Sequence, residues 1–447
     1  MSAGTAGPRL LIYSQDGLGL GHLRRTTLLA AECLVAEPAG SVLTICDSPL
    51  GQFFTKARGH DYLKLPSIRK IRPGEWSPIS LAQPFGEVLQ MRKDIIKAAA
   101  LAHRPDVLLV DHMPHGAMGE LVPTLEALHG TDTRVVLGLR DILDAPETIR
   151  RRWQLEGAVA AVEEHFDDVL VYGSRDVFDV ADEYQWPMPI RDRLHYCGYV
   201  CSPPTAGPAE AIRRRYVGEA RDLELVVAMA GGGADAAELF DTLVRSAPLL
   251  FSSRRCALVV ITGPFFPPAE RARLSALARG RVTIVPSVPD AMAHMRAADL
   301  VVAMAGYNTT AEILSTGTRA LLVPRPGPSA EQRMRASRFA ARGWVRWLPP
   351  ERLSEQALAG AILAALDAPP HTIRLGPDLG GRRRAALHLL NGRYRAAAAA
   401  RSDVTATGPA ALVGVGVGAI ASAPALAEAV PVDTRGTPAP ILRGSGP

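Results

Sequence analysis

Short runs of apolar, often β-branched residues recur along this chain, and stretches of helix length separate them. The runs are continuous rather than alternating with polar residues, which is typical of strands buried on both faces of a parallel sheet. Parallel strands need crossover connections, so the pattern restricts the chain to α/β architectures. The expected strands form two series: Arg9–Ser14, Ser41–Cys46, Asp106–Asp111, Arg134–Leu139 and Asp168–Tyr172, then Leu223–Met229, Ala257–Thr262, Val282–Val285, Asp299–Met304 and Arg319–Val323.

A proline-rich stretch, Cys201–Pro208, separates the two series and is the clearest linker signal in the chain. We therefore expect one domain over residues 8–200 and a second over residues 220–370. A helix rich in arginine and alanine is expected over residues 382–400. Residues 401–447 have low complexity, which predicts a disordered tail.

The charge and cysteine content of the chain limit which classes of ligand and structural site are expected. The net charge of +5 over 447 residues is modest, and it suits an anionic substrate or an acidic membrane surface without requiring nucleic acid. The five cysteines form no Cys-x-x-Cys pair, so neither a disulfide framework nor a zinc site is expected. No basic region followed by an apolar signal core begins the chain, and we expect a cytoplasmic protein. The uncharged segment Thr405–Ala427 could span a bilayer, but Pro409 and Pro424 favour a tail.

The turn after the first strand, Asp16–His22, contains Gly19 and Gly21 and precedes a helix expected from near Leu23. Glycines let a backbone approach phosphate closely, and a helix start offers free amides. The residue three positions after Gly19 is His22, where a dinucleotide-binding fingerprint has glycine. A phosphate or acceptor loop is therefore expected, and a simple glycine turn is the alternative.

Two further turns follow strands of the second series. One contains Gly231, Gly232 and Gly233, which would suit a phosphate or merely a flexible connection. The other begins at Gly306, where we expect a tight turn before a helix.

The residues after Gly306 predict more specific contacts. Asn308 or Thr309 is expected to cap the helix and leave its amides facing an anion. Glu312 lies one turn further, where its carboxylate could accept two ribose hydroxyls; a capped helix with a solvent-facing glutamate is the alternative. Glu331 and Gln332, at the start of the next helix, suit sugar hydroxyls or are ordinary polar residues of a helix start.

Three of these elements together resemble a known family. Gly306–Glu312, the proline-rich loop with Glu331-Gln332, and the Gly19-x-Gly21-His22 turn look like the GT-B glycosyltransferases of the family 28 type. The best-known members are the N-acetylglucosaminyltransferases that complete the lipid intermediate of peptidoglycan. The resemblance covers residues 9–360 and is strongest from Val282 to Leu348. It implies two Rossmann-like domains with parallel sheets facing across a cleft.

The resemblance also implies roles for single residues. The second domain would hold the nucleotide sugar, and the helix at residues 382–400 would cross back to the first domain. His22 would stand in the cleft beside the phosphates or the acceptor. The donor would then be bound by Gly231, Gly232, Gly233, Gly306, Asn308 and Thr309 at the pyrophosphate, Glu312 at the ribose, Val288 near the base, and Glu331 and Gln332 at the sugar.

Two departures limit what the resemblance implies about donor and acceptor. The family's Gly-Gly-His turn is here Gly19-Leu20-Gly21-His22, and no arginine near the linker matches the one that family members carry. The chain, including Gly138–Leu143, looks closer to a less-characterised group of bacterial family-28-like transferases.

Inverting transfer requires a base for the acceptor hydroxyl. The candidates are His22, Asp111, His112 and His115, of which we favour His22 and Asp111. Asp111 should end the third strand. Asp111 and His112 could act together, but neighbours on a strand point to opposite faces. A helix cap or a surface histidine is the alternative for each.

No Asp-x-Asp or His/Cys cluster appears, so we expect neither a metal nor a cofactor besides the nucleotide sugar itself, which we expect to be UDP-linked. We expect the acceptor, which the sequence does not identify, to be either lipid-linked or a small molecule. Gly19–Arg25 with Asp111-His112 is also similar to nucleotide-sugar hydrolases of flagellar sugar synthesis. The basic loop Ser67–Trp76, which suits anionic lipid at the inner membrane face or a phosphorylated acceptor, argues against hydrolysis. A nucleotide-sugar-responsive binding protein ranks last.

Overall fold

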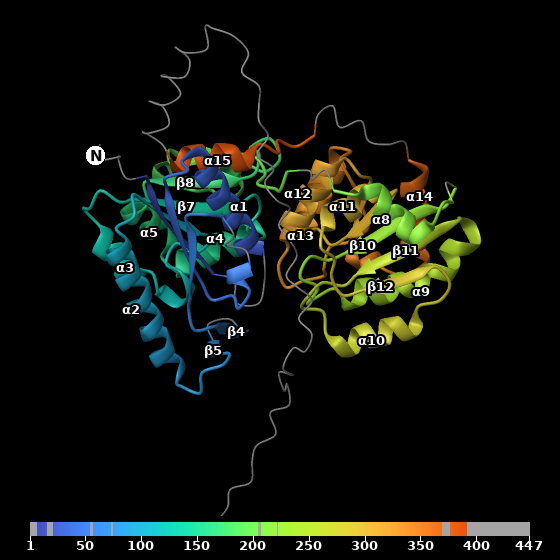
Figure 1. The fold of residues 1–447 in the computed structure, drawn as a ribbon. Coiled ribbons are helices and arrows are strands. Elements are labelled where there is room, and N and C mark those ends of the chain that lie inside the picture. The colour runs from blue at the N-terminus through green and yellow to red at the C-terminus, as the bar shows by residue number, and fades with distance from the viewer. Residues whose placement is uncertain are drawn as a thin grey trace, which may run out of the picture.

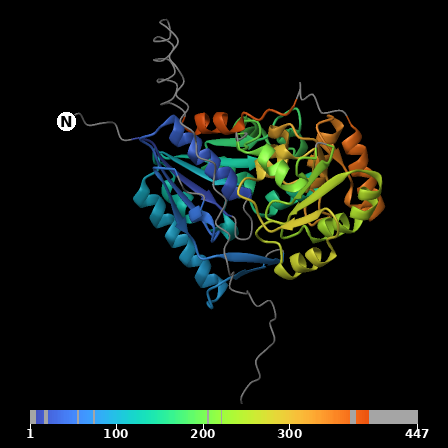
Figure 2. The ribbon, with the colours of Figure 1, turned by 45° about the vertical axis from the view of Figure 1, so that its right-hand side comes forward.

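The structure is a computed structural model that describes residues 7–15, 21–53, 57–72, 75–203, 207–220, 222–368 and 376–390. It contains two α/β units, each built around one parallel sheet (Figure 1). Figure 2 shows the same two units turned by 45°. Gly19, the end of the helix expected over residues 382–400, and the tail at residues 401–447 lie outside the described residues.

The N-terminal unit contains a seven-stranded sheet in the order β3-β2-β1-β6-β7-β8-β9, with every pair parallel. Successive residues of β1 alternate between two buried clusters, because neighbouring side chains on a strand point to opposite faces. The strands are β1 (Arg9–Ser14), β2 (Ser41–Cys46), β3 (His60–Lys64), β6 (Val107–Asp111), β7 (Arg134–Arg140), β8 (Asp168–Tyr172) and β9 (Leu194–Tyr196).

Helices cover both faces of this sheet. Buried residues of α1 belong to one cluster, and those of α3, α4 and α5 belong to the other. The helices are α1 (Gly21–Ala36), α2 (Phe85–His103), α3 (Val122–Leu128), α4 (Pro146–Leu155), α5 (Ala158–His165), α6 (Val180–Glu183) and α7 (Met188–Arg191), with short 3-10 turns η1 (Gly51–Phe53) and η2 (Ala117–Gly119).

The C-terminal unit contains a six-stranded sheet in the order β12-β11-β10-β13-β14-β15, again parallel throughout. Its strands are β10 (Glu224–Met229), β11 (Cys256–Ile261), β12 (Val282–Val285), β13 (Leu300–Ala303), β14 (Ala320–Leu322) and β15 (Arg346–Trp347). Its helices are α8 (Ala209–Val217), α9 (Ala237–Ser253), α10 (Pro268–Leu277), α11 (Ala291–Ala297), α12 (Tyr307–Thr316), α13 (Glu331–Ala341) and α14 (Glu355–Asp367), with the 3-10 turn η3 (Pro350–Arg352).

The expected fold class is confirmed, and all ten expected strands are present. Three parallel strands were not predicted because none carries a continuous apolar run: β3, β9 and β15, each at an edge of its sheet. The expectation for Ser67–Trp76 needs correction. Rather than a plain loop, this stretch lies largely in an antiparallel ribbon of β4 (Ile68–Arg72) and β5 (Glu75–Pro78), anchored by the buried side chain of Ile68.

The last described helix, α15 (Gly381–Leu389), lies on the N-terminal unit beside α1 (Figure 1). The guanidinium of Arg384 donates to the carbonyl of Cys197 at 2.8 Å, and Arg382 pairs with Glu32 at 3.2 Å. The chain therefore passes between the two units twice. Within the described ranges, no helix is both long enough and apolar enough to cross a bilayer.

Candidate active site

Two helix starts meet where the two units face each other. Helix α1 follows β1, and helix α12 follows β13, so each begins at the carboxyl end of a central strand. The side-chain amide of Asn308 donates to the carbonyl of Gly21 at 3.0 Å. Arg24 of α1 forms an ion pair with Glu312 of α12. Ligands of open α/β sheets bind at such strand ends, so this junction is the candidate active site.

His22, Asp111 and Arg25 form a compact charged group on the N-terminal side. Nδ1 of His22 lies 2.6 Å from Oδ2 of Asp111. Arg25 donates to both carboxylate oxygens of Asp111, at 3.0 and 2.8 Å, and lies 3.0 Å from Nδ1 of His22. Asp111 and Arg25 are buried, whereas the His22 side chain keeps 21% of its surface exposed. The imidazole is therefore the member that a substrate can reach.

The charge state of this group follows from its contacts. Burial alone would raise the pKa of Asp111, but the guanidinium of Arg25 and the imidazole of His22 outweigh burial and hold it below its usual value. Asp111 is therefore an ionised acceptor for the imidazole at neutral pH.

His112 lies closer to His22 than the alternation of strand residues predicts. Strand β6 ends at Asp111, and His112 has a φ of 81°, so the opposite-face argument does not apply to it. The rings of His22 and His112 lie 5.2 Å apart, centroid to centroid. Burial and the neighbouring His22 lower the pKa of His112 well below its usual range, so His112 is neutral. His115 lies elsewhere, beside Gly157.

Arg25 connects the two units through aromatic contacts. Its guanidinium lies 5.2 Å from the ring centre of Tyr172 on β8 and 5.3 Å from that of Tyr307 on α12. The hydroxyl of Tyr307 accepts from the amide of Val200 at 2.8 Å. Sequence reasoning missed Arg25 and Tyr307 as site residues. The only signal was the three-residue spacing from His22 to Arg25, which places both on one helix face.

The backbone conformation of the turn after β10 requires glycine. Gly231 and Gly233 have positive φ values of 60° and 89°, and a Cβ added at Gly233 would lie 1.9 Å from the carbonyl oxygen of Thr262. Only glycine fits such a position without a shift of the backbone. A Cβ added at Gly231 would lie 3.5 Å from Thr309 Oγ1, so this turn adjoins the start of α12.

The start of α12 differs from the expected cap. The N-cap residue is Gly306 and no side chain caps the helix, so neither Asn308 nor Thr309 has the predicted role. Asn308 contacts the other unit instead, and Thr309 is buried. The first amides of a helix have no partner within the helix, and a Cβ added at Gly306 would meet only open space. The helix start therefore remains suited to an anion.

Glu312 is buried rather than solvent-facing, with only 2% of its surface exposed. Burial raises its pKa, and the nearby Arg24 opposes that rise. Glu312 thus combines a desolvated carboxylate with a cation from the opposite unit.

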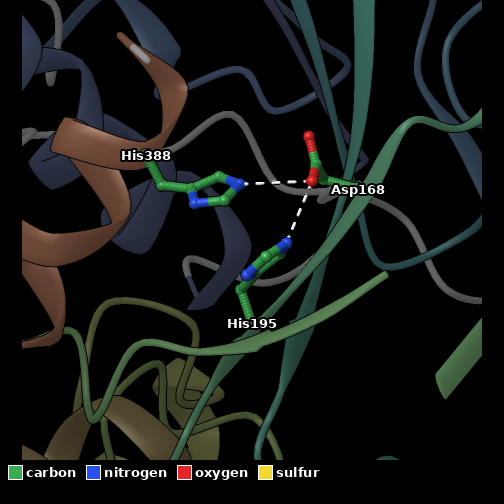
Figure 3. A group of neighbouring side chains, drawn as sticks. All are labelled: Asp168, His195 and His388. Atoms are coloured by element: carbon green, nitrogen blue, oxygen red, sulfur yellow. Dashed lines mark hydrogen bonds and ion pairs between the residues drawn. The ribbon is translucent and has the colours of Figure 1, made fainter. Parts of the chain in front are cut away.

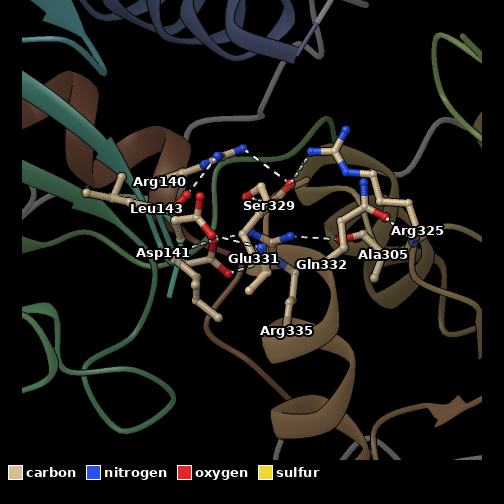
Figure 4. Close-up of polar contacts among 12 residues, drawn as sticks. Arg140, Asp141, Leu143, Ala305, Arg325, Ser329, Glu331, Gln332 and Arg335 are labelled. Atoms are coloured by element: carbon tan, nitrogen blue, oxygen red, sulfur yellow. Dashed lines mark hydrogen bonds and ion pairs between the residues drawn. The ribbon is translucent and has the colours of Figure 1, made fainter. Parts of the chain in front are cut away.

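Glu331 and Gln332 lie in a second polar contact between the units (Figure 4). Oε1 of Glu331 lies 3.3 Å from Arg325 and 3.7 Å from Arg140 of the N-terminal unit. The side chain of Gln332 accepts from the amide of Arg325 at 3.3 Å. Burial would raise the pKa of Glu331, but Arg140 and other arginines hold it below its usual value.

A buried ion pair between Arg335 and Asp141 also joins the two units next to this polar contact. Arg335 donates to both oxygens of Asp141, at 2.9 and 2.6 Å, and to the carbonyl of Ala305 at 2.7 Å. Both side chains are 1% exposed. Asp144 accepts from the amide of Ala330 at 2.8 Å. Residues that follow β7 thus fasten the start of α13, and the Gly138–Leu143 stretch gave no sequence sign of this role.

The remaining predicted donor residue, Val288, follows β12 and is partly buried against the main core. Gly21 is present at the first position of α1, whereas its predicted companion Gly19 lies outside the described residues.

Comparison with known proteins identifies the C-terminal unit. Residues 226–374 match the model of the glycosyltransferase family 28 C-terminal domain. These residues belong to that domain family. The matched range contains the glycine turn, the start of α12 and both buried glutamates, so the family 28 domain carries the predicted donor-binding residues.

A curated relative agrees with this assignment. The UDP-N-acetylglucosamine--N-acetylmuramyl-(pentapeptide) pyrophosphoryl-undecaprenol N-acetylglucosamine transferase of Verminephrobacter eiseniae (strain EF01-2) is 32% identical over 167 residues, which are 37% of this chain and 44% of the relative. The chain therefore spans less than half the length of that relative.

Solved structures extend the likeness to the whole fold. MurG of Acinetobacter baumannii has a TM-score of 0.52 at 15% identity, covering 85% of this chain and 95% of that one. A putative UDP-N-acetylglucosamine 2-epimerase from Listeria monocytogenes has a TM-score of 0.58 at 13% identity, covering 90% and 98%. The family 28 domain and its N-terminal partner together form a GT-B fold.

Proposed function

We propose that this protein is a glycosyltransferase that moves a sugar from a UDP-linked donor to an acceptor hydroxyl, with inversion and without a metal ion at the candidate active site. The observation that carries the proposal is that a candidate catalytic base and a candidate donor-binding surface face each other at one junction. A histidine paired with a buried carboxylate lies on one side, and the glycine turns and Glu312 of a family 28 domain lie on the other.

The donor would bind to the family 28 domain. The start of α12 and the turn at Gly231–Gly233 offer amides and space for a pyrophosphate. Glu312 would accept ribose hydroxyls after Arg24 moves from the carboxylate to the phosphates. Glu331 and Gln332 would meet the sugar, and Val288 the base. A UDP donor is supported by the name of the curated relative, which is that of a UDP-N-acetylglucosamine-dependent transferase.

His22 would be the base, with Asp111 as its positioning residue. The 2.6 Å contact with an ionised carboxylate favours a proton on Nδ1, which leaves Nε2 free to accept the proton of the acceptor hydroxyl. Asp111 is buried and already accepts from Arg25, so it is poorly placed to meet a substrate itself. One base beside the acceptor fits a single displacement, which inverts the anomeric centre.

The acceptor side would include the β4–β5 ribbon. Arg69 and Lys70 are exposed there, and half of the Ile71 surface is exposed. Such a surface suits a phosphorylated, lipid-linked acceptor at the inner membrane face. A small-molecule acceptor is the alternative, and we propose a cytoplasmic location for either case.

Thermal shift and turnover with a panel of UDP-, GDP- and dTDP-sugars test this proposal, with free sugar, nucleotide and epimerised sugar quantified in the absence of acceptor. We expect stabilisation by UDP-sugars alone, with negligible release of free sugar. His22→Ala should keep the donor-induced shift and lose turnover once an acceptor is found.

Other outcomes would contradict the proposal in distinct ways. Rapid release of free sugar would assign a hydrolase, and conversion of the sugar would assign an epimerase. No response to any nucleotide sugar would reject the donor site, and full activity of the His22→Ala variant would reject the assignment of the base.

A further inference from the structure

Three potential metal ligands meet at the end of the N-terminal sheet that lies away from the candidate active site (Figure 3). Asp168 is the first residue of β8, whereas Asp111 is the last residue of β6. His195 lies on the edge strand β9, and His388 lies in the last turn of α15. This cluster is therefore separate from the donor and acceptor sites, and the function proposed above does not use it.

The distances fit one metal ion between the three side chains. Nε2 of His195 and Nε2 of His388 lie 3.0 and 3.4 Å from the same carboxylate oxygen, Oδ1 of Asp168. One ligand atom from each residue lies within 4.8 Å of the others. Ligand atoms about 2.0–2.1 Å from a tetrahedral zinc ion lie about 3.4 Å from one another. Only small side-chain adjustments are therefore needed to bring all three to one ion.

The composition and exposure of the cluster suit a cation. It combines the carboxylate of Asp168 with two imidazoles, and the His195 side chain is 41% exposed, so an ion could enter from solvent. Nε2 of His388 is buried and lies 3.4 Å from Oδ1 of Asp168 without a hydrogen bond of good geometry.

Arg134 orients the carboxylate of Asp168 through the oxygen that does not face the two histidines. Its Nε donates to Oδ2 of Asp168 at 2.7 Å, and its Nη1 donates to the carbonyl of His388 at 2.9 Å. Such partners orient ligands around metal ions. The guanidinium also offsets the carboxylate charge, so we expect weaker binding than at a site with four protein ligands.

We propose that Asp168, His195 and His388 bind one divalent transition-metal ion, Zn²⁺ in tetrahedral geometry, with water at the fourth position. Two imidazoles and one carboxylate favour this class of ion over Mg²⁺, which prefers oxygen ligands. Because His388 belongs to α15 and the other ligands belong to the sheet, the ion would fasten the C-terminal helix to the N-terminal unit. An ion that binds only the folded chain stabilises it by mass action.

The sequence predicted no metal because the ligands share no local spacing. Residues 168, 195 and 388 come together only when the helix returns to the first unit. The five cysteines are all buried, and none belongs to the cluster of potential metal ligands found among the described residues.

Zinc titration of the untagged full chain tests the proposal. After treatment with a chelator and dialysis, calorimetry with Zn²⁺ should give one site per chain, and the thermal midpoint should rise with Zn²⁺ but not with Mg²⁺. His195→Gln should weaken binding at least tenfold, since its partly exposed side chain can be replaced without loss of the fold. His388→Gln should have the same effect, and His103→Gln, on α2, should leave binding unchanged.

Three results would overturn the proposal. The first is absence of zinc binding to the folded wild-type chain. The second is binding that survives both the His195→Gln and the His388→Gln substitutions. The third is equal stabilisation by Mg²⁺. In each case the three residues would serve only as a hydrogen-bonded anchor for α15.

Discussion

The two domains share one architecture but offer different chemistry at the ends of their strands. The N-terminal domain presents ionisable side chains, with His22 and Arg25 held on the buried Asp111. The family 28 domain presents mainly backbone, in the form of glycine turns and an uncapped helix start. Backbone amides suit a ligand that is always anionic, whereas a titratable side chain is required where a proton moves. Under the proposed function, this difference would separate donor binding from acid–base chemistry.

The exception to this division is instructive. The family 28 domain contributes two buried carboxylates, Glu312 and Glu331, and each pairs with an arginine of the other domain. Neither carboxylate has to be buried without a partner when the donor is absent, which would be costly. Donor binding would exchange arginine contacts for sugar hydroxyls, and so would link occupancy to the arrangement of the domains.

The largest effect is expected from Asp111→Asn. Loss of the charge that positions His22 should lower turnover by about 10²–10⁴-fold, while the affinity for the donor, measured by calorimetry, stays unchanged. Asp61→Asn, at an exposed position of β3, is the matched control. A loss of donor affinity as large as the loss of turnover would contradict the proposal that donor binding and acid–base chemistry belong to different domains.

The next largest effect is expected on stability, from loss of the buried ion pair between Arg335 and Asp141 that joins the domains. Arg335→Met leaves Asp141 buried without its partner and should lower the free energy of unfolding by about 3–5 kcal/mol. The half-exposed pair of Arg338 with Glu183 provides a comparison, and Arg338→Met should cost at most about 1 kcal/mol. Chemical denaturation measures both variants, and equal costs would mean that Asp141 and Arg335 are not buried together in solution.

A smaller effect is expected at the donor site. Glu312→Ala should weaken nucleotide-sugar binding more than tenfold, or about 1.4 kcal/mol, because the contacts with the ribose are lost. Glu238→Ala, at an exposed position in the first turn of α9, should have no effect. Calorimetry measures the affinity of both variants for the donor that the nucleotide-sugar panel identifies. An unchanged affinity of Glu312→Ala would contradict the proposal that Glu312 binds the ribose.

The smallest effect concerns pH. Burial lowers the pKa of His60 from 6.5 to about 4, so the unfolded chain takes up the proton first as the pH falls. The stability due to neutral His60 is full above pH 6.5 and is lost progressively down to about pH 4. At about pH 6 the loss is about 0.8 kcal/mol. His60→Gln should flatten the dependence of unfolding free energy on pH in this window, and an unchanged slope would contradict the assignment.

What the sequence could predict follows the same division between the domains. Turns such as Gly231–Gly233 and Gly306 are local patterns, so their residue types and positions are visible in the chain. The pair of His22 with Asp111 joins residues 89 positions apart. Each residue was a candidate because it lies near an expected strand end, but their pairing was not predicted. Arg24 with Glu312 and Asp141 with Arg335 had no such guide, because no local pattern encodes a contact between domains.

The double passage of the chain between the domains has a mechanical consequence. The two passages are hydrogen-bonded to each other, since the amide of Tyr199 donates to the carbonyl of Asp378 at 2.7 Å and the amide of Gly381 donates to the carbonyl of Tyr199 at 3.1 Å. Because these hydrogen bonds fix the two chain segments to each other at Tyr199, an opening motion of the two domains is expected to pivot near that residue. Any opening of the molecule would then be a swing that displaces the far rim most and the residues beside Tyr199 least.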